Sequence, residues 1–238
     1  MRVRRDTVSG AVREIEFFMV PNRVRNLERA EPRVRFETEE ERELHRLQIS
    51  KRNFTRTVNA NFDHTSYYST LTFDDGNEVH TFDDARRVLD RYVQRLRYKY
   101  PDARVVAVMG RGKNTRRIHF HMLSAGVDRD TIASKWTAGR VVRVDRLKKH
   151  NYYNGIDHGE DYTGLASYLF DHWTPEQGSH RWKYTRNLKK PERTTEPNGK
   201  RYGVRRPPAI PKGYKLVEAR SMGFGHLYYK CVRVGIRS

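Results

Sequence analysis

The sequence of 238 residues predicts an α+β fold. Strand-like and helix-like segments follow one another in the order strand, helix, strand hairpin, helix, strand, helix and closing strands. Apolar residues make up 36% of the chain, with 14 Tyr, 10 Phe and 3 Trp, which is enough for a hydrophobic core. No stretch of about 18 apolar residues occurs, so we predict no membrane-spanning segment.

The first half of the chain contains the clearest helix. Residues 37–46 predict a short polar helix, residues 67–73 are aromatic and β-branched as strands are, and residues 74–77 form a turn. Thr81 can cap the next helix, and Pro101 stops it. The apolar residues between them recur at helical spacing and predict one buried face: Ala85, Val88, Leu89, Tyr92, Val93 and Leu96.

The second half of the chain predicts mostly strands. Residues 104–109 and 118–123 are apolar segments around a polar turn and predict a strand hairpin. Asp128 can cap a helix that extends through Trp136. Four segments follow: a strand at 140–147, a helix at 162–173, an irregular Pro- and Gly-rich connector at 191–213, and a strand pair at 214–219 and 225–234.

The charge is strongly basic and unevenly distributed. The chain has 48 Lys and Arg against 29 Asp and Glu, a net charge of +19, which predicts a polyanionic partner such as nucleic acid. Residues 181–238 hold 16 basic and 3 acidic residues. Because this segment is also rich in apolar residues, we favour a folded polyanion-binding segment over a disordered basic tail. The single cysteine, Cys231, excludes an internal disulfide and a cysteine-based zinc cluster.

His119 and His121 are the sharpest candidates for chemistry. On a strand, residues i and i+2 project from one face, so the two imidazoles project together while Phe120 points into the core. Two neutral imidazoles side by side suit a divalent cation. A pair of structural histidines on a half-buried strand is the alternative interpretation.

Tyr168 lies on a helical stripe with Leu165, Leu169 and His172, and taken alone this stripe favours a core tyrosine. Residues 110–114 (GRGKN) resemble the end of a phosphate-binding loop. They lack the required first glycine and the final Ser or Thr, so we reject nucleotide binding there. The cations of this turn can instead hold a phosphate backbone near the histidines: Arg111, Lys113, Arg116 and Arg117.

Taken in order, three motifs resemble those of the HUH endonucleases, and more narrowly the rolling-circle replication initiators (Rep) of bacterial plasmids and phages. Residues 69–73 (STLTF) match a Thr-rich strand, His119-Phe120-His121 matches His-hydrophobic-His, and residues 166–169 (ASYL) match the first half of a tyrosine-helix motif. Residues 181–191 are basic, as the segment after that helix often is in the family. The resemblance covers about residues 51–191.

Two positions depart from the family pattern. Asp171 stands where a lysine is usual, and His172 is a possible substitute. The strand before the histidines lacks the carboxylate that often serves as a third metal ligand, and Gly110 stands near that place. Tyr162 is the alternative nucleophile, and it lies roughly 240° around the helix from Tyr168, so the two cannot share one face.

The resemblance implies a central antiparallel sheet that carries the His-x-His strand, with helices packed on it. It also divides the chain into three parts. These are a charged N-terminal extension (residues 1–50), a nicking domain (residues 51–191), and a basic C-terminal segment (residues 192–238) that completes the sheet or binds DNA.

The function implied by the resemblance is that of a metal-dependent single-strand DNA endonuclease and strand transferase. Mg or Mn on His119 and His121 would polarise the scissile phosphate. Tyr168 would attack the phosphorus, giving a 5′-phosphotyrosine and a free 3′-hydroxyl that primes replication.

The expected partners are single-stranded DNA at a replication origin and the host helicase and polymerase, with no membrane partner. No apolar run marks a signal peptide, so the expected location is the bacterial host cytoplasm. Two alternatives stay open. One is a HUH transposase or relaxase, and the other is a non-catalytic, repressor-like DNA- or RNA-binding protein.

Overall fold

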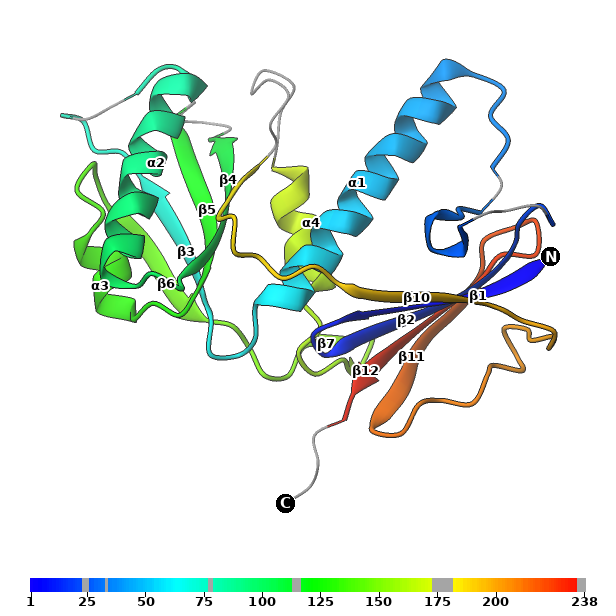
Figure 1. Cartoon of the computed structure of the whole chain (residues 1–238). Coiled ribbons are helices and arrows are strands. Elements are labelled where there is room, and N and C mark those ends of the chain that lie inside the picture. The colour runs from blue at the N-terminus through cyan, green and yellow to red at the C-terminus, as the bar shows by residue number, and fades with distance from the viewer. Residues whose placement is uncertain (23–25, 33, 77–78, 113–116, 173–181, 235–238) are drawn as a thin grey trace. The chain divides into compact units, whose positions relative to one another are not determined.

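The computed structural model describes residues 1–22, 26–32, 34–76, 79–112, 117–172 and 182–234, and of Val142 the backbone alone (Figure 1). The chain divides into two compact units. The first unit comprises Met1–Ala60, His150–Asp161 and Lys190–Ser238, and the second comprises Asn61–Lys149 and Tyr162–Lys189. Each unit holds a five-stranded antiparallel sheet accompanied by helix, which confirms the α+β class. No helix within the described ranges is long and apolar enough to cross a membrane.

The sheet of the second unit has the strand order β6-β3-β5-β4-β9 and is antiparallel throughout (Figure 1). Its central strand is β5 (Ile118–Ala125), which carries both histidines, as predicted. β5 pairs with β3 (Tyr67–Thr72) on one side and with β4 (Arg104–Arg111) on the other. The edge strands are β6 (Val141–Arg146) and β9 (Trp182–Tyr184).

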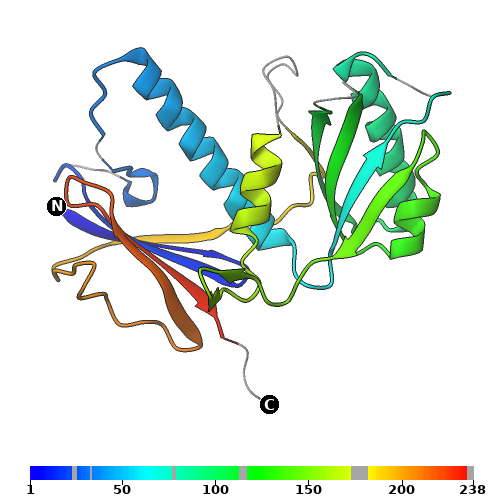
Figure 2. The ribbon, with the colours of Figure 1, turned by 180° about the vertical axis from the view of Figure 1, so that it is seen from behind.

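One face of this sheet is apolar and is covered by α2 (Phe82–Lys99) and α3 (Arg129–Ser134) (Figure 2). Phe120 of β5 is fully buried in this core. The start of α2 is confirmed, because Thr81 Oγ1 accepts a hydrogen bond from the Asp84 amide. The apolar face is also confirmed, since the buried residues of α2 are Phe82, Ala85, Leu89, Tyr92, Val93 and Leu96.

Helix α3 is shorter than the sequence predicts. Asp128 caps it as expected, accepting a hydrogen bond of 2.7 Å from the Thr131 amide, but the helix ends at Ser134. Trp136 lies beyond the helix, where its indole Nε1 donates to the Thr72 carbonyl at 2.9 Å. Its ring packs edge-on against Phe120 in the sheet core, so tertiary contacts override the helical spacing here.

Helix α4 (Thr163–Asp171) lies on the opposite face of the sheet from α2, as Figures 1 and 2 both show. It buries Ala166, Leu169 and Phe170, and the Phe170 ring lies 5.7 Å from the ring of Trp182 on β9. The sequence predicts this helix over residues 162–173, of which Trp173 lies outside the described residues.

The sheet of the first unit has the order β10-β1-β2-β12-β11 and is also antiparallel. The predicted closing strand pair is confirmed, and it joins the first two strands of the chain because β12 pairs with β2. The predicted irregular connector contains β10, whose backbone pairs along the edge of β1. The strands are β1 (Arg2–Ser9), β2 (Val12–Met19), β10 (Glu192–Pro197), β11 (Tyr214–Ser221) and β12 (Leu227–Arg233).

Helix α1 (Glu39–Asn61) is much longer than the short polar helix predicted at residues 37–46. It continues because Phe54 and Val58 find buried positions, which a polar pattern alone does not reveal. Arg56 is also buried and pairs with Glu14 and Glu16 of β2. The remaining short elements are η1 (Leu27–Arg29) and the hairpin of β7 (Tyr152–Tyr153) and β8 (Ile156–Asp157).

Candidate functional site

His119 and His121 project from the face of β5 that lies opposite the apolar core. Their Nε2 atoms are 3.2 Å apart, and their rings meet edge-on. Phe120, between them, points to the other face and is fully buried. Metal–nitrogen bonds to histidine are about 2.0–2.1 Å long, so two nitrogens this close can bind one ion from neighbouring positions. The two imidazoles therefore fit a shared cation.

The second ring nitrogen of each histidine is held by the protein. The Tyr68 hydroxyl lies 2.7 Å from His121 Nδ1, and the Thr70 hydroxyl lies 3.4 Å from the same atom. His119 makes a hydrogen bond with the backbone of Arg117. When Nδ1 of His121 carries the proton and donates it to Tyr68, its Nε2 keeps a lone pair that faces His119. Metal-binding histidines are usually oriented by such outer hydrogen bonds.

Burial keeps both histidines in the neutral form. It lowers the pKa of His121 to about 3, with further contributions from the charges of His119 and His172. Burial also lowers the pKa of His119, although the hydrogen bond with the Arg117 backbone opposes the shift. A neutral imidazole is the form that binds a metal, so protons compete with a cation only in acid solution.

Helix α4 places Tyr168 against the histidines. The Tyr168 ring lies 5.7 Å from the His121 ring and 4.1 Å from the His172 ring, and the side chain is 48% exposed. Its hydroxyl is hydrogen-bonded to that of Tyr68, whose pKa is raised chiefly by burial and further by Tyr168. Tyr68 thus links Tyr168 to His121, and the exposed side of Tyr168 stays open to a substrate.

Tyr162, the alternative nucleophile, is placed elsewhere. It is 2% exposed, occupies the position before the first turn of α4, and donates a hydrogen bond of 3.0 Å to the Lys148 carbonyl. The two tyrosines therefore have different environments, as their separation around the helix predicts. Of the two, the structure brings Tyr168 to the histidines.

His172 joins the same cluster, whereas Asp171 is exposed. The His172 ring lies 4.6 Å from the His121 ring, and its Nδ1 donates a hydrogen bond of 2.8 Å to the Tyr168 carbonyl. This bond links the end of α4 to the turn before it and orients the His172 ring beside Tyr168.

Gly110 of β4 lies directly across from His119 in the sheet register. A Cβ atom at this position would lie 2.8 Å from His119 Nε2, so the glycine leaves the room that the imidazole occupies. Among the described residues, no group of three or more His, Cys, Asp or Glu side chains is arranged to hold a metal ion. Further ligands to an ion at the two histidines would have to come from water or from substrate oxygens.

Sequence reasoning missed Tyr68, Thr70 and Arg143. Thr70 pairs with His121 in the register and also with Arg143 of β6. The Arg143 guanidinium lies 5.7 Å from the Tyr68 ring, and its side chain is 62% exposed. The period-2 spacing of Tyr68 and Thr70 puts them on one strand face, but only the strand pairing shows that this is the histidine face.

The cations of the turn at residues 110–117 are only partly described, since Lys113 and Arg116 lie outside the described residues. Arg117 pairs with Asp75, and Arg111 lies over the ring of Phe82 in α2. No helix follows this turn, because residue 118 begins β5.

Residues 66–177 match the family model of replication-associated protein ORF2. The matched segment runs from the residue before β3 through α4, so it contains both histidines and Tyr168. The match indicates a replication-associated protein and, within that class, a replication initiator, in agreement with the broader part of the sequence resemblance. The comparisons with curated proteins and with solved structures gave no match.

Proposed function

We propose that this protein nicks and rejoins single-stranded DNA at a replication origin by tyrosine phosphoryl transfer. The observation that carries this proposal is the contact of Tyr168 with the paired histidines of β5, with the Tyr168 ring 5.7 Å from that of His121. A solvent-open tyrosine beside two neutral imidazoles is suited to attack on a phosphate that a cation holds in place.

His119 and His121 would hold a divalent cation, Mg or Mn, through their facing Nε2 atoms. When bound, the cation would neutralise charge on the scissile phosphate. Tyr68 and the Arg117 backbone would keep the two rings in position.

Tyr168 would supply the nucleophile. Its phenol oxygen forms a bond to phosphorus as the bond from phosphorus to the 3′ oxygen breaks; Tyr168 loses its proton and the leaving 3′ oxygen gains one. The products are a 5′-phosphotyrosine and a free 3′-hydroxyl, and the reverse reaction rejoins the strand. Because Tyr68 can accept from His121 Nδ1 and donate to Tyr168, it would stabilise the phenolate of Tyr168.

Arg143 would act on the same charge from the other side of Tyr68. Its guanidinium lies over the Tyr68 ring, and the pairing of β6 with β3 fixes the backbone that carries it. A cation at this exposed position can contact the phosphate backbone next to the reacting group.

The test is capture of the covalent adduct. The protein is incubated with a single-stranded origin oligonucleotide and Mn²⁺, and the products are separated under denaturing conditions. We expect an adduct with the wild-type protein and with Tyr162→Phe, and none with Tyr168→Phe.

An adduct that persists in Tyr168→Phe and disappears in Tyr162→Phe would assign the nucleophile to Tyr162. Tight, salt-sensitive binding without any adduct would instead favour a non-catalytic, repressor-like DNA- or RNA-binding protein. Strand transfer between two DNA molecules without reuse of an origin would favour a transposase or relaxase.

A further inference from the structure

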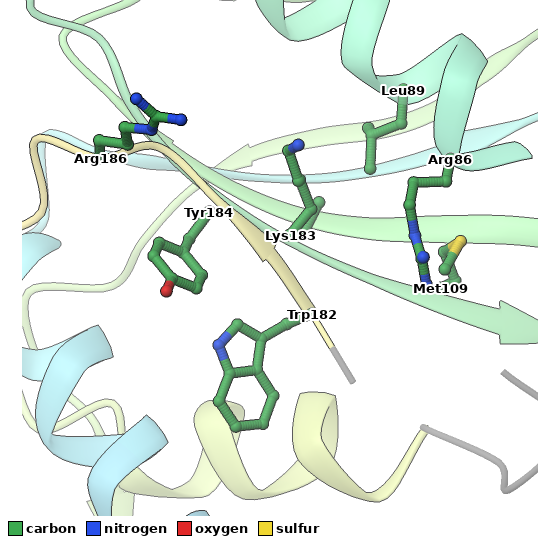
Figure 3. A pocket seen from close by; sticks show the side chains of 8 residues that line it. Arg86, Leu89, Met109, Trp182, Lys183, Tyr184 and Arg186 are labelled. Carbon is green, nitrogen blue, oxygen red and sulfur yellow. The ribbon is translucent and has the colours of Figure 1, made fainter. Parts of the chain in front are cut away.

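The edge strand β9 forms part of a pocket of about 290 Å³ in the second unit (Figure 3). Its volume lies at the lower end of the roughly 300–1,000 Å³ that is typical of small-molecule sites, so it suits a group as small as one nucleotide base. The lining side chains come from α2, β4, β9 and the segment just after β9: Arg86, Leu89, Ala107, Met109, Trp182, Lys183, Tyr184 and Arg186.

Two aromatic rings stand on one side of the pocket. Trp182 and Tyr184 are two residues apart on β9, so they share a face of the strand, as Figure 3 shows. Trp182 is held against Phe170 of α4, while Tyr184 is 54% exposed. An anchored indole beside an open phenol ring is a surface on which a planar base can stack.

The pocket lies on the same row of the sheet as the histidine site. Val108 of β4 pairs with His121 on one side and with Trp182 on the other. Neighbouring strands are about 4.8 Å apart, so Trp182 lies about 10 Å from His121 across the sheet. This separation places the pocket close to a phosphate bound at the histidines but outside the reacting group.

Three cations border the rings. Lys183 pairs with Asp90 at 2.8 Å, and Arg86 approaches Asp83 at 3.7 Å. Both pairs are partly exposed, and exposed ion pairs contribute little stability, so a phosphate can compete for these cations at small cost. Arg186 is exposed at the end of the same segment. Rings for bases together with cations for phosphates are the combination that binds single-stranded nucleic acid.

We propose that the β9 pocket binds a nucleotide that flanks the scissile phosphate, with its base on Tyr184 and Trp182 and its phosphates on Lys183, Arg186 and Arg86. The inference rests on the proposed function for the choice of single-stranded DNA. It adds a binding subsite that neither histidine nor Tyr168 belongs to.

The test compares two labelled probes of equal length, oligo(dT) and an abasic oligomer, in fluorescence anisotropy titrations. The abasic probe keeps the phosphates and lacks the bases, so it separates stacking from charge. We expect Tyr184→Ala to weaken oligo(dT) binding roughly 5- to 100-fold and abasic binding less than about twofold.

Tyr184→Phe should restore oligo(dT) binding, because it keeps the ring. The matched control is Tyr98→Ala on α2, which removes a tyrosine that is 92% exposed and lies outside the pocket. Tyr98→Ala should leave both affinities unchanged. Arg186→Gln should lower the slope of log affinity against log salt by about 0.7, the value for one phosphate contact on a single strand.

Equal loss of affinity for both probes in Tyr184→Ala, or no loss for either, would overturn the inference. The result is independent of chemistry, because oligo(dT) binding is measured without cleavage. An adduct at Tyr168 with no effect of Tyr184→Ala would refute the pocket alone. A base-dependent effect of Tyr184→Ala without any adduct would refute the proposed chemistry and leave the pocket in place.

Discussion

The hydroxyl of Tyr68 lies 2.7 Å from Nδ1 of His121 and is also hydrogen-bonded to the side chain of Tyr168. One side chain on β3 therefore contacts both kinds of group that the proposed reaction needs, the histidine that would hold a cation and the tyrosine that would attack. The Thr70 hydroxyl lies 3.4 Å from the Tyr68 oxygen and supports the same arrangement.

Tyr68→Phe should weaken Mn²⁺ binding by roughly 10- to 100-fold, because His121 loses the partner that orients its ring. It should also slow adduct formation when Mn²⁺ is saturating, since Tyr168 loses its hydrogen bond. Mn²⁺ titration followed by electron paramagnetic resonance measures the first effect, and single-turnover kinetics measures the second.

Tyr67→Phe is the matched control for this substitution. Tyr67 neighbours Tyr68 on β3 but is buried in the core on the other face of the sheet. Unchanged Mn²⁺ affinity in Tyr68→Phe, or an equal loss in Tyr67→Phe, would argue against a specific role for Tyr68.

Gly110→Ala should weaken Mn²⁺ binding roughly tenfold without unfolding the protein. The new Cβ would lie 2.8 Å from His119 Nε2, and the imidazole is the flexible partner that must move. Gly164→Ala in α4 is the control, because a Cβ there meets no atom within 4 Å. If Gly110→Ala bound Mn²⁺ as tightly as Gly164→Ala, the position of His119 would not matter for the ion.

Acid should destabilise the first unit through Glu16. Burial alone would raise the pKa of this carboxyl, but the hydrogen bond with His226 and the charges of Arg52 and Arg56 outweigh burial and hold the pKa well below its ordinary value of 4.5. A lowered pKa in the folded state means that the carboxylate contributes stability above about pH 4.5. This contribution is lost as the pH falls from there toward the folded pKa.

Urea unfolding of wild type and Glu16→Gln between pH 7 and pH 3 tests this linkage. We expect Glu16→Gln to be less stable by about 3 kcal/mol at pH 7, because Arg56 is left buried with one partner fewer. The difference should shrink below pH 4.5, where wild type begins to lose its own carboxylate. A difference that stayed constant with pH would assign the acid sensitivity to other groups.

Gly10→Ala should cost at least about 2 kcal/mol of folding free energy. Gly10 has a φ of +61° in the turn between β1 and β2, and a Cβ there would lie 2.1 Å from the Asn59 carbonyl oxygen of α1. Gly213→Ala is the control, since its φ is +80° but a Cβ would meet open space, so it should cost only about 1 kcal/mol. Equal urea midpoints for the two variants would show that α1 yields at this contact.

Local patterns in the sequence determined the parts of the fold that depend on neighbouring residues. The period of 3.6 residues placed the buried face of α2, with Leu89 and Leu96 in the core. The period of 2 put His119 and His121 on one face of a strand, and the structure places Phe120 on the other. The separation of Tyr162 from Tyr168 around a helix likewise predicted that they differ in environment.

Tertiary structure decided what depends on residues far apart in the chain. Strand pairing, which a local pattern does not specify, brought Tyr68 and Thr70 beside His121 and placed Trp182 in the row of Val108. The same cause put β12 beside β2, so removal of residues 192–238 would take three strands out of the first sheet. Periodicity shows which face of a strand is buried, but register and strand order come from backbone hydrogen bonds and packing that form only when distant segments meet.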